Sequence, residues 1–115
     1  MRYEIETVDR FKLIRVNGNI ENETDAKLFD DEISNLIERG CRRFVFELNN
    51  ARYLDNAGIS IFIRCLCSVE KKRGSVFIIA LDEEVRKVLE MVGLDRLIQT
   101  FDSKYMFFEA QGVMC

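Results

Sequence analysis

The sequence predicts an α/β fold: a single-layer mixed β-sheet with an N-terminal antiparallel hairpin, parallel crossovers and about four helices. Two observations predict it. Segments with the apolar alternation of strands take turns with segments that have the three-to-four-residue period of amphipathic helices. The links between them are short, which favours parallel crossovers in the middle of an α/β layer. We expect one domain over residues 1–115.

The composition supports a folded chain and excludes several kinds of chemistry. Of 115 residues, 48% are hydrophobic, which is enough for one core. The net charge is −3, and without a long basic block nucleic-acid binding is disfavoured. The absence of histidine excludes histidine bases and histidine metal sites. No apolar run approaches the ~20 residues of a membrane-spanning helix, and no secretion signal precedes the first strand, so we expect a cytoplasmic protein without membrane insertion.

The first elements are a hairpin and a helix. Residues 3–8 alternate between polar and apolar, 9–10 form a tight turn, and 11–16 return as the second strand. The helix is expected to open at Asn22 or Thr24, both able to cap exposed amides. Gly40 suits the left-handed position just past its end. One buried stripe is formed by Phe29, Ile33, Leu36 and Ile37.

The middle of the chain predicts a buried strand and a strongly apolar helix. Residues 44–48 are almost continuously apolar, as expected for a strand covered on both faces. From Ile59 the period becomes helical, and the basic residues 71–73 favour the negative end of the helix dipole before Gly74 ends the helix. The predicted buried side comprises Ile59, Phe62, Ile63, Leu66 and Val69, widened by Ile61 and Cys65.

The last third predicts two more strands and two more helices. Residues 76–80 read as a buried strand and 97–101 as a short edge strand. Asp82 is expected to cap the third helix, and Asp102 or Ser103 the last, which runs through Gln111. The third helix has an apolar face formed by Val85, Val88, Leu89 and Val92, and Gly93 closes it.

The cysteines and basic runs carry no predicted site. Cys65 and Cys67 lie two apart on a helix and point to different faces, so they cannot share a metal ion. Cys41 and Cys115 complete no metal-binding spacing, and we expect four reduced thiols that pack as small hydrophobic groups. The basic runs 42–43 and 71–73 are interpreted as solvated ends of a strand and a helix.

One strand-to-helix junction stands out, because it places an acid, an amide, a small residue and a glycine before the most apolar helix. Its sequence, at 53–59, is YLDNAGI. One interpretation is structural: Asp55 or Asn56 caps the helix, and Gly58 allows close packing. The other is functional, since sites in α/β layers tend to lie where strands lead into helices.

At this junction the sequence resembles the STAS domains of bacterial anti-sigma factor antagonists, and the resemblance covers nearly the whole chain. Residues 53–59 match the family's signature of two hydrophobic residues, Asp, Ser, a small residue, Gly and a hydrophobic residue. The ending of the second strand, VNGNIE at 16–21, and the late turn MVGLDRLI at 91–98 are similar to two further family patterns. The resemblance implies a non-enzymatic interaction module.

The match departs at the position that matters for regulation. Phosphorylatable relatives carry a serine directly after the signature Asp, and here that residue is Asn56, followed by Ala57. Neither has a hydroxyl group, so neither can accept phosphate. Ser60 is the nearest hydroxyl, and we interpret it as a polar spot on the helix. The resemblance therefore implies a partner surface that stays uncharged at position 56.

The leading hypothesis is an anti-sigma factor antagonist without a phosphoacceptor, whose partner is a serine-kinase-type anti-sigma factor or a related regulatory protein. We expect an exposed contact formed by Asp55, Asn56, Ala57, Gly58 and Ile59, with Glu21 and Asn22 from the neighbouring loop. Asp55 would order the loop, and Gly58 would let a partner backbone approach. No catalytic residue, metal or cofactor is implied.

The alternative hypothesis is an accessory or sensor domain of a transporter or signalling assembly that binds a small or apolar ligand. The apolar C-terminal segment, residues 106–108 with 113–114, could form a docking or homodimer surface, or it could pack in the core. An enzyme is the third hypothesis, and the sequence offers no phosphate loop, metal set or histidine to support it.

Overall fold

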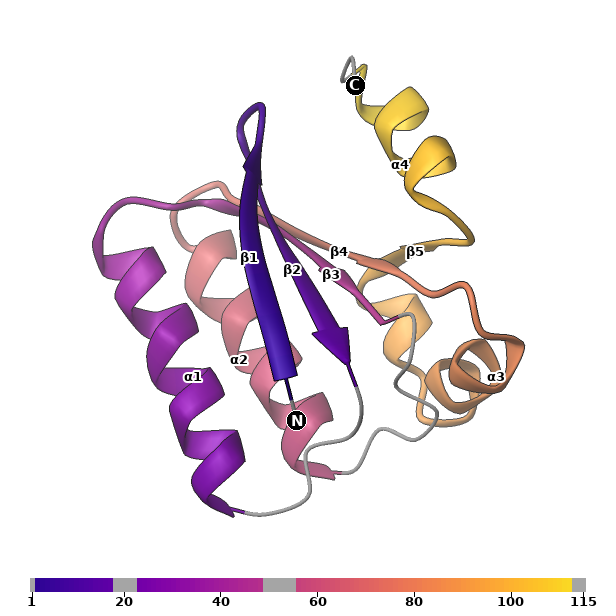
Figure 1. Cartoon of the computed structure of the whole chain (residues 1–115), viewed down its shortest axis with the longest axis horizontal. Helices are drawn as coiled ribbons and strands as arrows, with labels where there is room; N and C mark the ends of the chain where they lie inside the picture. Colours follow the sequence, from indigo (N-terminus) through magenta and orange to yellow (C-terminus); the bar gives the residue numbers. More distant parts are fainter. Residues whose placement is uncertain (1, 18–22, 49–55, 113–115) are drawn as a thin grey trace.

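The structure, a computed structural model, describes residues 2–17, 23–48 and 56–112; for Arg2, Glu23, Asn56 and Ala57 it describes the backbone only. The elements follow the predicted order of strands and helices (Figure 1). They are β1 (Arg2–Val8), β2 (Phe11–Asn17), α1 (Glu23–Glu38), β3 (Arg43–Glu47), α2 (Asn56–Glu70), β4 (Ser75–Ile79), α3 (Glu83–Met91), η1 (Leu94–Arg96), β5 (Gln99–Phe101) and α4 (Lys104–Gln111).

The strands form one mixed sheet in the order β1-β2-β3-β4-β5, which confirms the predicted fold class. β1 and β2 are antiparallel and in register from Arg2↔Asn17 to Val8↔Phe11, because only two residues join them. The remaining neighbours are parallel. Helices α1 and α2 make the first two parallel crossovers, as parallel pairing requires a long connection.

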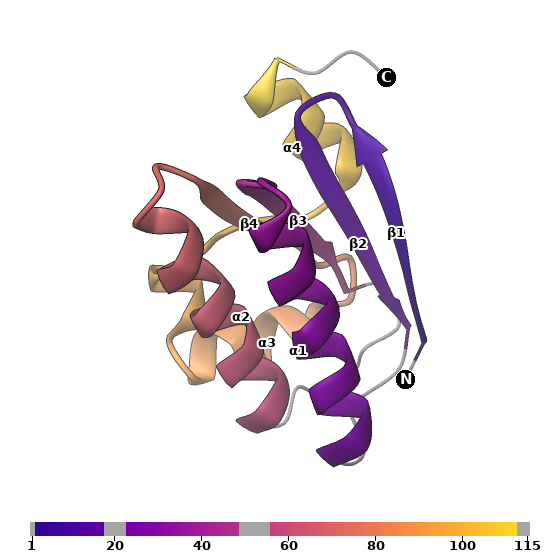
Figure 2. The ribbon, with the colours of Figure 1, turned by 90° about the vertical axis from the view of Figure 1, so that its left-hand side faces the viewer.

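Helices α1 and α2 lie side by side on one face of the sheet, and α4 lies on the other (Figures 1 and 2). The core between the sheet and α1, α2 and α3, here called the main core, is apolar and includes the predicted stripe of α1. Its aromatic centre is Phe46, whose ring lies 4.7 Å from that of Phe62 and 6.2 Å from that of Phe29, measured between centroids.

A smaller core, the second core, lies between the opposite face of the sheet and α4. It consists of Phe11, Leu13, Val45, Ile79, Phe101, Phe107 and Phe108, with Val8 and Phe77 packed against it. Phe107 is fully buried, and its ring lies 5.1–5.5 Å from those of Phe11, Phe77, Phe101 and Phe108. Core packing is therefore what Phe107 and Phe108 do, whereas Met106 is exposed and residues 113–114 lie outside the described residues.

Helix starts agree with the sequence where a side chain caps the helix. The Asp82 carboxylate accepts a hydrogen bond from the Glu84 amide at 2.8 Å, and the Ser103 hydroxyl accepts one from the Met106 amide at 3.2 Å. The prediction of Thr24 as the cap of α1 is wrong, because α1 begins at Glu23 and contains Thr24. The alternative cap, Asn22, lies outside the described residues.

Helix α2 begins at Asn56, three residues before the predicted helical pattern starts. The apolar period detects a helix only where it packs on the core, and the first turn contributes polar and small residues. Within α2, the fully buried hydrophobic side chains are those of Ile61, Phe62, Cys65 and Val69, whereas three of the predicted core positions, Ile59, Ile63 and Leu66, are half-buried at the border of the core.

The backbone hydrogen bonds that end α1 and α2 follow the same pattern, but a different type of residue takes the left-handed position after each helix. Gly40 takes the left-handed position after α1, with φ at +102°, as predicted. After α2 that position belongs to Arg73, with φ at +63°, and not to Gly74. Gly74 is required one residue later, because a Cβ there would overlap the carbonyl oxygen of Arg42 and lie 2.8 Å from the Cβ of Val69.

Two further expectations are corrected by burial. Val92 is the C-cap of α3 and is half exposed, so it leaves the apolar face that Val85 and Leu89 occupy. Cys67 is exposed on α2, and among the three described cysteines Cys65 alone is a buried thiol. Burial, with a smaller contribution from Asp30, raises the pKa of the Cys65 thiol to about 12. Cys41 is half-buried, and Cys115 lies outside the described residues.

Candidate functional site

The predicted recognition residues belong to one edge of the sheet, where β2 and β3 end and α1 and α2 begin. The parallel pairing of Arg15 with Glu47 places the ends of β2 and β3 next to each other. Helices α1 and α2 pack together along this face, and their first turns lie at the same end of the molecule (Figure 2). The fold therefore brings together the elements that lead into the two predicted segments.

The individual residues are only partly described. Glu21, Asn22 and Asp55 lie outside the described residues. Asn56 and Ala57 form the first turn of α2 with backbone described and side chains not described. Gly58 is buried, which favours its packing role over an approach by a partner backbone. Ile59 is half-buried against the main core, and Ser60 is exposed on α2, as expected for a polar spot.

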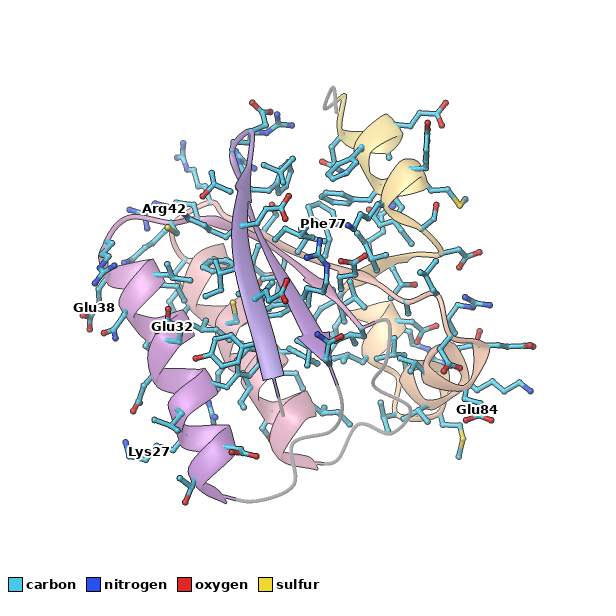
Figure 3. All side chains as sticks on the ribbon, viewed as in Figure 1. Lys27, Glu32, Glu38, Arg42, Phe77 and Glu84 are labelled. Atoms are coloured by element: carbon cyan, nitrogen blue, oxygen red, sulfur yellow. The ribbon has the colours of Figure 1, made fainter. Side chains whose placement is uncertain are left out.

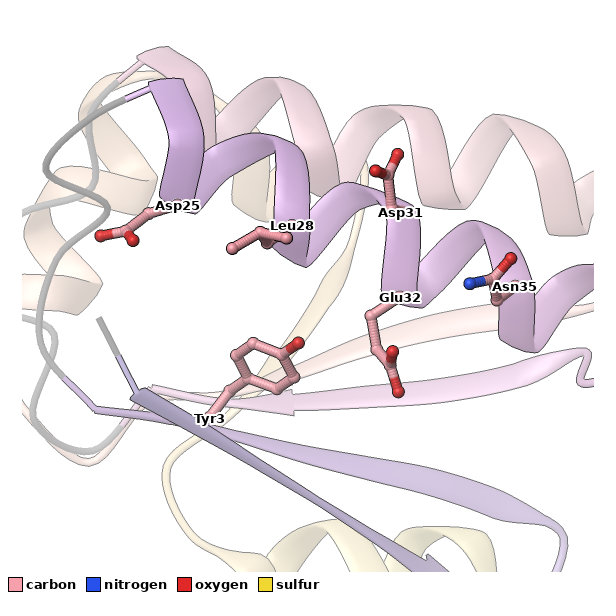
Figure 4. Close-up of a pocket in the computed structure, with 6 residues that line it drawn as sticks. All are labelled: Tyr3, Asp25, Leu28, Asp31, Glu32 and Asn35. Atoms are coloured by element: carbon pink, nitrogen blue, oxygen red, sulfur yellow. The ribbon is translucent and has the colours of Figure 1, made fainter.

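A cleft next to this edge was not predicted. It lies between the beginning of β1 and the outer side of α1, has a volume of about 330 Å³, and is drawn in Figure 4. One aromatic side chain, Tyr3, comes from the sheet, and Figure 4 shows it facing α1. Helix α1 supplies the other five lining residues: Asp25, Leu28, Asp31, Glu32 and Asn35.

The cleft combines negative charge with an aromatic ring. Burial, and then the neighbouring Glu32 carboxylate, raise the pKa of the Tyr3 phenol, so the phenol stays neutral and able to donate a hydrogen bond. Lys27 offsets part of the charge, since its ammonium lies 3.2 Å from Asp31 one turn away. Leu28 adds apolar surface that is 60% exposed. Such a lining suits a cationic or hydrogen-bond-donating group.

A buried carboxylate on the opposite face was also missed. Glu47 is 1% exposed, and its oxygens lie 2.8 Å from Nε of Arg15 and 3.7 Å from Nζ of Lys104. Arg15 also contacts the exposed Glu4 and Glu6 of β1. The hydrogen bond that Arg15 donates to the Glu47 carboxylate is the main reason that the pKa of the Arg15 guanidinium is raised. The sequence contained one sign of this buried carboxylate, a single acid inside the otherwise apolar run 44–48.

This network consists of paired charges on β1, β2, β3 and α4. Glu47 is satisfied by Arg15, a residue paired with it on the neighbouring strand. Within the described residues, no group of three or more Cys, Asp or Glu side chains is arranged to hold a metal ion. In the same part of the chain, no helix has the length and apolar character to cross a membrane.

A sequentially ordered mixed sheet with helices on both faces is the architecture of the class that the junction at 53–59 suggested. The STAS domain family matches residues 2–105, and the chain belongs to this family. Among curated relatives, the anti-sigma-B factor antagonist of Staphylococcus aureus is 22% identical over 98 residues, covering 85% of this chain and 90% of that protein. The anti-sigma F factor antagonist of Paenibacillus polymyxa is 20% identical over 92 residues, covering 80% and 79%.

Solved structures confirm the fold. The unphosphorylated anti-sigma factor antagonist SpoIIAA aligns with a TM-score of 0.80 at 18% identity, over 99% of this chain and 100% of that one. An anti-sigma factor antagonist from Mycobacterium paratuberculosis aligns with a TM-score of 0.81 at 18% identity, over 95% and 92%. The strand order and the helix placement of the present chain are thus those of its family.

Proposed function

We propose that this protein is an anti-sigma factor antagonist that binds a serine-kinase-type anti-sigma factor without being phosphorylated at the usual position. The observation that carries the proposal is the match of 80–85% of the chain to relatives named anti-sigma factor antagonists, combined with an asparagine where the family signature has its serine. The role is one of binding, and it assigns no catalytic residue to the chain.

The proposed contact surface is the edge where α1 and α2 begin. It comprises residues 55–59 with Glu21 and Asn22; the burial of Gly58 assigns that residue to packing of the first turn of α2. The cleft at Tyr3 adjoins this edge, because Tyr3 pairs with Val16 near the end of β2. Its carboxylates would receive a basic side chain of the partner, which charge complementarity would steer into place.

Asn56 explains why the interaction would be permanent. Phosphorylation adds about −1.5 to −2 charges and three acceptor oxygens, which disrupts a surface fitted to a neutral group. An amide cannot be phosphorylated, so the kinase activity of the partner would leave this antagonist in its binding form.

Titration calorimetry with the kinase-type anti-sigma factor of the same organism tests the contact surface. Asn56→Arg introduces a long cation at the start of α2, and we expect it to weaken binding at least tenfold. The matched control is Gln99→Arg, the same change from amide to guanidinium at an exposed residue of β5, which is expected to bind like the wild type. Equal affinities for the two variants would exclude this surface.

Incubation of the protein with the kinase and radiolabelled ATP tests the loss of the phosphoacceptor. The wild type is expected to remain unlabelled, and Asn56→Ser is expected to gain one phosphate. Asn56→Ala serves as the control, since it changes the same position without a hydroxyl group. Stoichiometric phosphate on Ser60 of the wild type would overturn the proposed mode of regulation.

A further inference from the structure

Two basic segments that are far apart in the sequence meet at the end of the molecule opposite the proposed contact edge. One follows α1 and leads into β3, and the other follows α2 and leads into β4. We call their six cations the basic pole: Arg39, Arg42, Arg43, Lys71, Lys72 and Arg73. Figure 3 shows Arg42 at this end, close to where α1 terminates at Glu38.

Strand pairing brings the two segments together. Arg43 is in register with Ser75, and the Ser75 amide donates a hydrogen bond of 2.9 Å to the carbonyl oxygen of Arg42. Gly74 packs directly on the same carbonyl group. Adjacent strands lie about 4.8 Å apart, so the side chains that flank this contact form one surface. From the sequence alone the basic runs are interpreted as two separate solvated ends, whereas the fold places them next to each other.

The cations of the basic pole are not used inside the protein. Among the described residues, none of the six forms a salt bridge, whereas Arg10, Arg15, Lys27, Arg64, Arg86, Lys87 and Lys104 all do. Five of the six are exposed, and Arg43 is half-buried. A stabilising role at the helix dipoles accounts for little, because neither α1 nor α2 has a basic residue in its last turn, where that effect is strongest.

The charge of the basic pole opposes that of the rest of the chain. Its six cations are flanked by only two carboxylates, Glu38 and Glu70, in a protein whose net charge is −3. The acidic cleft with Asp25, Asp31 and Glu32 lies along the outer side of α1, between the helix and the beginning of β1. This uneven distribution of charge would orient the molecule in front of an anionic surface with the basic pole towards it.

The surroundings of the basic pole favour one kind of anionic partner. The two connections that carry its cations follow α1 and α2 at the same end of the molecule (Figure 2). The exposed large hydrophobic side chains of the described residues all lie elsewhere, including Tyr105, so no aromatic platform for nucleic-acid bases accompanies the charges. Clusters of four to eight Lys and Arg residues are typical of electrostatic binding to anionic lipids.

We propose that the basic pole is a docking surface for an anionic lipid bilayer, which holds the protein peripherally and without insertion. Helix α1 has 16 residues and a length of about 24 Å. That length separates the basic pole from the edge where α1 and α2 begin. A molecule docked on lipid headgroups therefore keeps the proposed partner surface open, and the two interactions can be tested separately.

Vesicle co-sedimentation of the full chain tests the proposal. The probes are vesicles of phosphatidylcholine alone and of phosphatidylcholine with an equal part of phosphatidylglycerol. At low salt the wild type is expected to sediment only with the second kind, and about 0.5 M salt should release it, because screening then acts within a few ångströms. Equal sedimentation with both kinds, or none with either at low salt, would refute the proposal.

Two double variants separate the basic pole from net charge. Each basic residue near an anionic membrane changes partitioning about fivefold, so Arg42→Glu with Lys72→Glu is expected to weaken binding by at least ~25-fold. The control is Lys87→Glu with Arg96→Glu, an identical change in net charge at exposed residues of α3 and η1, with an expected change of at most about threefold. Circular dichroism establishes that both variants are folded. Similar losses in both would contradict the proposal.

Competition identifies the chemistry of the partner. Inorganic phosphate and sodium chloride at equal ionic strength are expected to displace the protein from vesicles equally, and stronger displacement by phosphate would assign the basic pole to a phosphate ion instead. Duplex DNA and a polyglutamate peptide are expected to bind more weakly than phosphatidylglycerol vesicles. Tighter binding of either one would overturn the proposal in favour of that class of partner.

Discussion

The two faces of the sheet are closed by different means. On the face of α1 and α2, long helices cover the strands, and the main core is apolar throughout. On the other face the eight-residue helix α4 covers the second core, and the sheet beyond it is closed by charged side chains centred on Glu47. Arg15 and Lys104 contact Glu47, and Arg15 reaches on to Glu4 and Glu6.

This difference shows how the length of a covering helix determines which side chains the strands beneath it can carry. Where α4 offers no apolar surface, the sheet carries the Glu47 carboxylate. Its burial costs little free energy because Arg15, its register partner on β2, pairs with it. The main core is therefore sensitive to lost volume, whereas the other face depends on volume under α4 and on charge pairing beyond it.

The largest effect is expected from Phe46→Ala in the main core. Phe46 is fully buried and touches the rings of Phe29, Phe44 and Phe62, so its removal should lower the free energy of unfolding by about 4 kcal/mol. The comparison is Phe107→Ala under α4, with an expected loss of about 2–3 kcal/mol, because the short helix α4 can detach without unfolding the rest. Urea unfolding measures both values.

Hydrogen exchange distinguishes the mechanisms of these two losses. Phe107→Ala should accelerate exchange in α4 selectively, and Phe46→Ala should accelerate it in both α1 and α2. Uniform acceleration throughout the chain in Phe107→Ala would mean that α4 is an integral part of one cooperative unit.

The next effect concerns the charged network. Glu47→Gln keeps the shape of the side chain and removes its charge, and we expect a loss of about 2 kcal/mol because Arg15 then faces a neutral partner in a buried setting. The matched control is Glu4→Gln, since Glu4 contacts the same arginine but is largely exposed; its expected loss is below about 0.5 kcal/mol. Equal losses would show that burial of Glu47 contributes nothing.

The pH dependence of stability tests how completely the main core shields the Cys65 thiol from water. Burial raises the pKa of the Cys65 thiol from 9.0 to about 12, so above pH 9 the unfolded chain loses this proton while the native chain keeps it. Through this thiol, the free energy of unfolding should fall by roughly 1.4 kcal/mol for each pH unit between 9 and 12. Cys65→Ala removes this contribution, and the difference between its pH profile and that of the wild type measures it.

The smallest effect is expected at the turn that follows α2. Arg73 occupies a left-handed conformation that costs an L-residue about 1–2 kcal/mol, so Arg73→Gly should raise the free energy of unfolding by roughly 0.5 kcal/mol after the added flexibility of the unfolded chain is subtracted. Thermal unfolding detects the change. A decrease in stability would indicate that the Arg73 side chain contributes more than its backbone costs.

Local signals predicted much of the fold. Asp82 and Ser103 cap their helices as expected, and Gly40 and Gly93 take the left-handed positions, because each of these roles depends only on neighbouring residues. Gly74 was assigned to the helix end for the wrong reason. Its true constraint is a carbonyl group 32 positions earlier in the chain, which no local pattern contains.

The candidate site was predicted less completely than the fold. The signature around Asn56 was visible because its residues are consecutive. The cleft at Tyr3 was not, since it combines one strand residue with the outer side of α1, which periodicity classifies only as solvent-facing. The basic pole was missed for a similar reason: the interpretation of each run was correct locally, and only the pairing of β3 with β4 joins them.

The sheet order has a consequence for how the chain acquires its structure. Each strand lies next to the strand that precedes it in the sequence, from the first to the fifth, and none is inserted between two others. The β-hairpin can form within microseconds, and each following strand can then dock on an edge that already exists. During synthesis the growing polypeptide can thus assemble from its amino terminus onward, with α4 as the last element to close over the finished sheet.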